Sequence, residues 1–128
     1  MKAGVYNEGA CGIEQVIYLG KIDHKATGAV KLENALPKGV KLTRVVVDVK
    51  TAFNAATTNT LKVGSKTTAD KFAGTGDSTL GTAGQYIKQS FKDVADADCE
   101  VYATYAQSGA AATAGVAEIY AYVVKVEV

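Results

Sequence analysis

Few side chains in this sequence could carry a hydrolytic reaction, which needs a nucleophile, a base and a group that orients the base. The single histidine, His24, lies between Asp23 and Lys25 in a short polar segment. A histidine in such a place is far more often an exposed turn residue than a base. Cys11 would be a nucleophile only if the fold brought His24 to it, and no Gly-x-Ser-x-Gly sequence is present. We therefore expect no catalytic residue and no enzyme activity.

Two further segments contain residue types that bind cations or phosphates. Asp93, Asp96, Asp98 and Glu100 place their carboxylates close together in the sequence, and carboxylate oxygens are Ca²⁺ ligands. The spacing of a calcium-binding loop is absent, so a solvated turn is the favoured interpretation. The segment 64–67, Gly-Ser-Lys-Thr, lacks the earlier glycine of a phosphate-binding loop. Two cysteines and one histidine at unrelated spacings make no zinc site. We expect neither a metal nor a cofactor.

The seven tyrosines are the remaining candidates for binding, because aromatic rings stack on sugars and also fill protein interfaces. Tyr86, Tyr102 and Tyr105 would form a sugar platform if the fold placed them on one surface. Tyr120 and Tyr122 alternate along an apolar segment near the C-terminus. We interpret these two as packing or interface residues.

Length and charge narrow the possible functions. A chain of 128 residues fits a single domain. Its 14 basic and 13 acidic residues are spread along the chain and give no basic stripe for a nucleic acid. Neither a leader-like apolar run nor a membrane-length one occurs, so we expect a soluble protein that makes no membrane contact. Cys11 and Cys99 are either reduced or joined in one bridge, and reduced thiols are favoured.

Alternation of apolar and polar residues indicates the strands that must position any binding residue. The stretch between residues 36 and 64 begins with a Pro-Gly turn and continues as a strand with one wet face. Its valines are expected to face the core and its charged residues to face water: Val45, Val47 and Val49 against Arg44, Asp48 and Lys50. Phe53 marks where this strand leaves the sheet, and Leu61 and Val63 resume the alternation. We expect the two strands to form an antiparallel hairpin within one sheet.

The same alternation predicts strands elsewhere: 13–22, 29–36, 85–91, 99–107 and 116–128. The last strand is apolar on both faces, so we expect the core to cover one face and a partner molecule the other. The glycine-rich segment 65–84 is expected to be a long loop with at most one helical turn, near 68–72. Residues 1–12 are expected to form a flexible N-terminal arm, and residues 13–128 a single domain. Seven or eight strands separated by turn signals predict an all-β protein, an antiparallel β-sandwich.

Two segments carry a resemblance to a known family. The first is Leu36-Pro37-Lys38-Gly39 with the valine-rich strand after it, followed by Thr51–Asn54 and residues 57–64. The second is the small-residue loop 108–115 followed by the apolar final strand. Together they resemble small head proteins of tailed bacteriophages, the decoration or cement proteins, over roughly residues 28–128. The resemblance implies a jelly-roll-like sandwich and supplies no catalytic residue.

The resemblance also implies a function and partners. Decoration proteins sit on the outside of the capsid and clamp neighbouring major capsid subunits, so we expect a structural virion protein that is made in the host cytoplasm. We expect a homo-oligomer, a dimer or a trimer, that binds the major capsid protein. The alternative is a phage tail or fibre domain, or a carbohydrate-binding sandwich. The residues expected at an interface are Tyr6, Phe72, Tyr120, Tyr122 and Val124.

Overall fold

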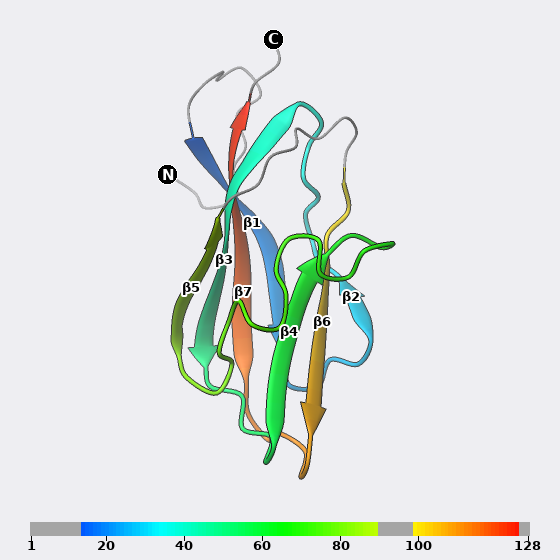
Figure 1. The fold of residues 1–128 in the computed structure, drawn as a ribbon, viewed down its shortest axis with the longest axis vertical. Helices are drawn as coiled ribbons and strands as arrows, with labels where there is room; N and C mark the ends of the chain where they lie inside the picture. Colours follow the sequence, from blue (N-terminus) through cyan, green and yellow to red (C-terminus); the bar gives the residue numbers. More distant parts are fainter. Residues whose placement is uncertain (1–13, 90–98, 126–128) are drawn as a thin grey trace.

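The computed structural model describes residues 14–89 and 99–125, and these residues form two antiparallel sheets that pack face to face (Figure 1). The expected arm, residues 1–12, lies outside the described residues, as do residues 126–128 of the expected last strand. Among the described residues the strands are β1 (Glu14–Asp23), β2 (Ala29–Lys31), β3 (Val40–Thr51), β4 (Thr58–Gly64), β5 (Gly84–Gln89), β6 (Tyr102–Ser108) and β7 (Val116–Lys125). The prediction of an all-β antiparallel sandwich is confirmed. Within the same ranges, the structure has no helix long and apolar enough to cross a membrane.

The strand order is that of a long ribbon doubled back on itself and then rolled up. One sheet has the order β1-β7-β3-β5 and the other the order β2-β6-β4. The ribbon consists of the antiparallel pairs β1–β7, β2–β6 and β3–β5. At its closed end, an isolated bridge between Val63 and Ala73 takes the place of an eighth strand. Rolling the ribbon adds the pairs β3–β7 and β4–β6, which gives a jelly-roll arrangement.

The expected hairpin between residues 36 and 64 is wrong. Strand β3 belongs to the four-stranded sheet and β4 to the three-stranded sheet, so the two strands lie in opposite layers (Figure 1). The connection between them crosses the sandwich at Phe53, whose side chain is buried in the core. Strands β6 and β7, which are also consecutive, likewise lie in different sheets. Alternation reveals that a segment is a strand but not which strand it pairs with, because both sheets present the same period.

The structure confirms the predicted inner face of β3 and corrects the prediction that its outer face is exposed to water. Val45, Val47 and Val49 are almost fully buried in the core, as expected. The opposite face of the strand is not simply wet, because Asp48 is only 8% exposed and Val46 is also buried. Strand β3 lies between β5 and β7, so side chains on both neighbouring strands cover its outer face.

A β-bulge interrupts the alternation of side chains along β1. The pairing with β7 shifts between Tyr18, opposite Tyr120, and Gly20, opposite Ile119. The extra residue is Leu19, and it changes the phase of the alternation. Ile17, Leu19 and Ile22 therefore all reach the core although their spacing is not a uniform two.

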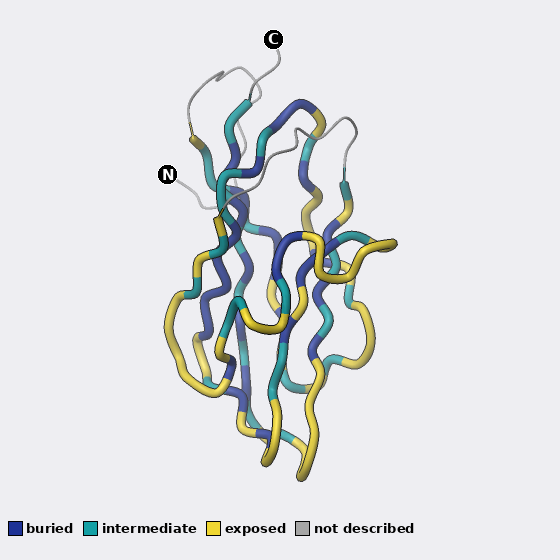
Figure 2. Tube along the Cα trace, in the orientation of Figure 1, coloured by how far each residue is buried: buried dark blue, intermediate teal, exposed yellow. Residues whose placement is uncertain are grey.

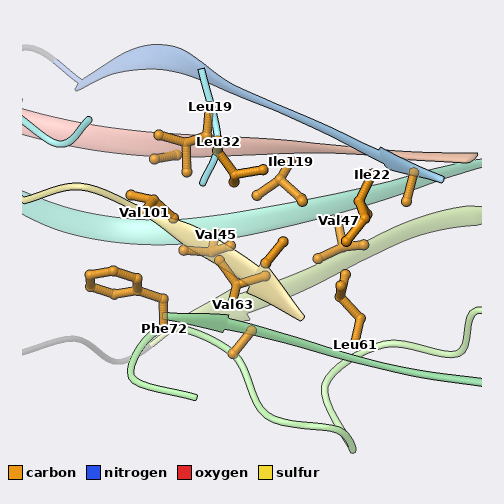
Figure 3. Packing of buried hydrophobic residues seen from close by; sticks show 14 of the residues in the cluster. Leu19, Ile22, Leu32, Val45, Val47, Leu61, Val63, Phe72, Val101 and Ile119 are labelled. Carbon is orange, nitrogen blue, oxygen red and sulfur yellow. The ribbon is translucent and has the colours of Figure 1, made fainter. Parts of the chain in front are cut away.

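The core lies between the two sheets and is apolar throughout. Burial follows the strands and exposure follows the loop ends (Figure 2). From the four-stranded sheet, the inner face of β7 is fully covered, and Ile119 points at residues of the other layer (Figure 3). Leu61 and Val63 approach from β4. Each such aliphatic side chain stabilises the fold by about 1.5 to 3 kcal/mol relative to an exposed one.

The glycine-rich segment 65–84 is a loop, as expected, but it has no helical turn. Ser65 closes a tight turn instead: its hydroxyl accepts a bond from the Thr68 amide at 3.1 Å, and its own amide donates to the Thr68 carbonyl at 2.9 Å. Phe72 and Leu80 are buried and anchor the loop on the core. The loop thereby covers part of the core at the position where an eighth strand would lie.

Candidate functional site

The outer face of the four-stranded sheet carries a candidate binding surface among the described residues. Residues on all four strands line a shallow groove of about 470 Å³ there. They share one side of the sheet because side chains alternate along each strand. We call this surface the tyrosine face. The residues that line it are Val16, Arg44, Val46, Asp48, Lys50, Gln85, Ile87, Tyr120 and Tyr122.

Aromatic and aliphatic groups occupy the centre of the tyrosine face. The ring of Tyr120 meets the ring of Tyr18 edge to face, with centroids 5.3 Å apart. The Arg44 guanidinium lies 4.5 Å from the centroid of the Tyr122 ring, a cation–π contact. Ile87 is 50% exposed, and among the described residues it is the one large hydrophobic side chain that is exposed. This centre is partly desolvated before any partner binds.

Paired charges surround that centre. Arg44 Nη2 lies 2.7 Å from Glu14 Oε1. Lys50 Nζ lies 2.7 Å from Asp48 and 3.8 Å from Glu118. The Tyr120 hydroxyl donates to Glu118 at 3.3 Å. An apolar aromatic centre with a polar rim of both signs is the usual anatomy of a protein–protein interface.

Hydrogen bonds and burial shift the pKa of several groups on this face. The hydrogen bond from Arg44 lowers the pKa of Glu14 below its ordinary value, and a second bond from Thr43 acts in the same direction. The hydrogen bond to Asp48 raises the pKa of Lys50. Burial raises the pKa of Tyr120, which stays a neutral hydroxyl. These three shifts all move the pKa of the group further from neutral pH.

The expected interface residues fall into three groups. Tyr120, Tyr122 and Val124 lie half-buried on the outer side of β7, towards the tyrosine face. Phe72 is placed differently, because its side chain is 7% exposed and packs in the core beneath the 65–84 loop. Tyr6 lies outside the described residues.

Sequence reasoning missed the contributions of β3 and β5 to this face. Arg44 was interpreted as a solvated residue, and Ile87 only as a strand residue. The signal was present for Val46, which interrupts the polar side of β3 with an apolar residue. Its partners could not be found without the strand order, which places Ile87 and Tyr120 on either side of it.

The residues considered for catalysis and metal binding do not come together in the described chain. His24 is half-buried, not exposed as expected, and its Nδ1 atom is buried without a hydrogen-bond partner. Of the acidic segment, Glu100 is described and pairs with Lys31, whereas the three aspartates lie outside the described residues. Residues 14–89 and 99–125 hold no group of three potential metal ligands. Cys99 is a free thiol, and Cys11 lies outside the described residues.

The tyrosines proposed as a sugar platform do not share a surface. Tyr105 is buried in the core, where its hydroxyl donates to Asn59 at 2.6 Å. Tyr102, three residues earlier in the same strand, points to the opposite side of β6. Tyr86 packs against the core from the other sheet, and its hydroxyl donates to the Thr82 carbonyl at 2.7 Å. These three rings cannot stack on one sugar.

Comparison with known proteins identifies relatives of the fold. No protein-family model matches the chain, and no curated protein sequence matches it. A chain in the capsid asymmetric unit of cyanophage Pam1 has a similar structure, with a TM-score of 0.67 and 20% identity over 97% of this chain and 93% of that one. A chain in the acid-stable capsid structure of Helicobacter pylori bacteriophage KHP30 has a TM-score of 0.56 and 21% identity over 91% of this chain and 100% of that one. Each match spans nearly a whole chain on both sides.

Proposed function

We propose that this protein is a structural, non-enzymatic component of a phage virion that binds the outside of the capsid and clamps neighbouring major capsid subunits. One observation carries the proposal: the whole described sandwich shares its fold with chains of two phage capsid structures. Both coverages exceed nine-tenths in each comparison. The similarity is therefore to small complete chains and not to one domain of a larger protein.

The tyrosine face gives this function a physical basis. A clamp must resist force without rearranging, and here the rings of Tyr120 and Tyr122 are already held by Tyr18 and Arg44. A side chain that is ordered before binding loses little conformational entropy when the partner arrives. Many copies on one shell then add their contacts, so each single contact can be modest.

The clamp is tested by adding the purified protein to heads that lack it. We expect saturable co-sedimentation at a fixed copy number and a higher melting temperature of the shell. The double variant Tyr120→Ala/Tyr122→Ala should bind at least about tenfold more weakly, because tyrosines at the centre of an interface carry much of its binding energy. Tyr102→Ala, which removes a half-buried tyrosine from the opposite sheet, is the matched control and should bind like the wild type.

Two outcomes of this experiment are informative in different ways. Absence of saturable binding to heads would contradict the clamp itself. Normal binding by the double variant would keep the clamp but contradict the assignment of the tyrosine face as its contact surface.

A second candidate is a carbohydrate-binding module, for which the groove and its polar neighbours Asp48 and Gln85 are the favouring observation. The Arg44 guanidinium covers one side of the Tyr122 ring, and Tyr18 packs against Tyr120. A sugar would have to displace these contacts in order to stack, so the clamp is the better-supported proposal. Affinity for glycans together with failure to bind heads would reverse that order.

A further inference from the structure

Three of the four sheet edges are protected in the described chain. The edge of β1 carries the bulge at Leu19, and Asn34 binds it twice: its amide donates to the Leu19 carbonyl at 3.0 Å and its side chain to the Tyr18 carbonyl at 2.7 Å. The edge of β4 is bridged by Ala73, and β2 has only three residues. Bulges, coverings and short strands are the means by which proteins stop a sheet edge from pairing with another chain.

Strand β5 has none of these protections within the described residues. It is the last strand of the four-stranded sheet, with β3 on one side. Its register with β3 is unbroken from Gly84 to Gln89, so it has no bulge, and its sequence contains no proline. Gln85, Ile87 and Gln89 are exposed. A regular edge strand with an exposed isoleucine at its middle is a template for a further strand.

Among the described residues, the side chains on the inner side of β5 make contacts that do not occupy its outer edge. Lys88 Nζ lies 3.5 Å from Asp77, and the Tyr86 hydroxyl bonds to Thr82. Both partners belong to the loop that precedes β5, and both contacts lie on the core side of the sheet. They fix the strand in place without pairing with its outer backbone groups.

We propose that β5 pairs in antiparallel orientation with β5 of a second copy of this chain, across a two-fold axis at Ile87. The two four-stranded sheets then form one continuous sheet, and the two tyrosine faces form one surface. A two-fold contact requires a surface that is complementary to itself. The sequence of β5 is complementary to itself when the two-fold axis passes through Ile87.

Pairing about Ile87 matches each side chain with a compatible one. Ile87 lies opposite its own copy, which buries two exposed apolar groups together. Gln85 lies opposite Gln89, and their amides can bond to each other. On the inner side Tyr86 lies opposite Lys88, a ring beside a cation. No like charges face each other, and opposed like charges are what destabilise a strand pair.

The neighbouring registers are worse for identifiable reasons. Pairing centred on Lys88 sets two lysines against each other, which is destabilising. Pairing centred on Tyr86 sets Ile87 against Gln85 and loses the contact between the two isoleucines. The pattern of β5 therefore selects both the partner and the register.

The test measures the mass of the full chain in solution, without heads, by analytical ultracentrifugation over a range of concentrations. We expect a monomer–dimer equilibrium. Ile87→Lys and Ile87→Glu should each raise the dissociation constant by at least about tenfold, because each places like charges across the axis. An equimolar mixture of the two variants should recover a mixed dimer, since the introduced lysine of one copy then faces the introduced glutamate of the other. Lys62→Glu, an exposed change in β4 of the other sheet, should leave the equilibrium unchanged.

Several results measured without heads would overturn this proposal. These are a wild type that stays monomeric at its highest soluble concentration, a trimer, a dimer that Ile87→Lys does not weaken, or a mixture of variants that does not recover the dimer. Circular dichroism of both variants establishes that they are folded. A monomeric wild type whose binding to heads is lost in Ile87→Lys would assign the edge to a capsid strand and would also overturn self-pairing.

Discussion

The side chain of Asn54 is bonded to the backbone around Thr113, and this joins the two connections that cross between the sheets. Asn54 Oδ1 accepts hydrogen bonds from the amides of Thr113 at 2.8 Å and Ala114 at 3.0 Å. Its Nδ2 donates to the Thr113 hydroxyl at 3.0 Å. One connection leaves β3 and the other enters β7. The asparagine therefore holds the two crossings side by side at one end of the sandwich.

Replacing this asparagine should destabilise the fold measurably. Asn54→Ala removes all three bonds, and we expect a loss of about 1 to 3 kcal/mol in the free energy of unfolding. Urea denaturation followed by circular dichroism measures it. Thr113→Ala is the matched control, since it removes only the bond to the hydroxyl and keeps both backbone bonds. It should cost about 1 kcal/mol or less, and equal losses in the two variants would contradict the role given to the asparagine.

Gly115 should not accept a side chain. Its φ is +150°, and a Cβ atom built there would lie 2.5 Å from Phe53 Cγ, inside contact distance. The phenylalanine cannot move aside because it is buried in the core. Gly115→Ala should therefore lower the free energy of unfolding by about 1 to 3 kcal/mol, the usual cost of overpacking. Gly76→Ala, with no atom within 4 Å of the added Cβ, should change the stability much less.

Val47→Asp should unfold the isolated protein. The valine is 2% exposed on the inner side of β3, so the change buries a carboxylate without a partner. The expected cost is about 4 kcal/mol or more, a large share of the stability of a small domain. Val124→Asp is the control, because that residue is half-buried on the outer side of β7. A cooperative thermal transition in Val124→Asp and its absence in Val47→Asp would support the assigned facing; a folded Val47→Asp would contradict it.

The pair Glu14–Arg44 should make stability fall in acid. Hydrogen bonds from Arg44 and Thr43 lower the pKa of Glu14 in the folded protein. A lowered folded-state pKa gives stability that is fully present above the unfolded value, near 4.5, and is lost as the pH falls through the lowered value. The effect should be small because the pair is over a third exposed at Glu14. Melting temperatures of the wild type and Glu14→Gln should differ at neutral pH and converge in acid, and salt should reduce the difference. A difference that grows as the pH falls would contradict this.

The strands could be predicted because their signal is local. Alternation in β3 reports which side chains are buried, and Val45, Val47 and Val49 were identified correctly as inward residues. For β7 the two apolar faces were recognised, but the sequence did not show which of them enters the core. The alternation failed in β1, where the bulge at Leu19 changes its phase. A bulge depends on the pairing with the partner strand, so it cannot be predicted from the sequence of one strand alone.

The candidate site was predicted only in its β7 part. Tyr120 and Tyr122 were recognisable from one strand, whereas Arg44 and Ile87 come from strands distant in the sequence. The sugar platform proposed for Tyr86, Tyr102 and Tyr105 was wrong for a different reason, which the sequence already contains for Tyr102 and Tyr105. Their separation by three residues already places them on opposite sides of one strand.

The sequence by itself determined that this chain forms strands and, in β3, which side of the strand enters the core, because burial imposes a period of two on neighbouring residues. Only the tertiary structure decided which strands are neighbours. It put β3 and β4 into different sheets and joined four strands into the tyrosine face. The physical reason is that strand pairing and the connections between the two sheets depend on contacts between residues far apart in the chain. The alternation within one segment contains no information about those contacts.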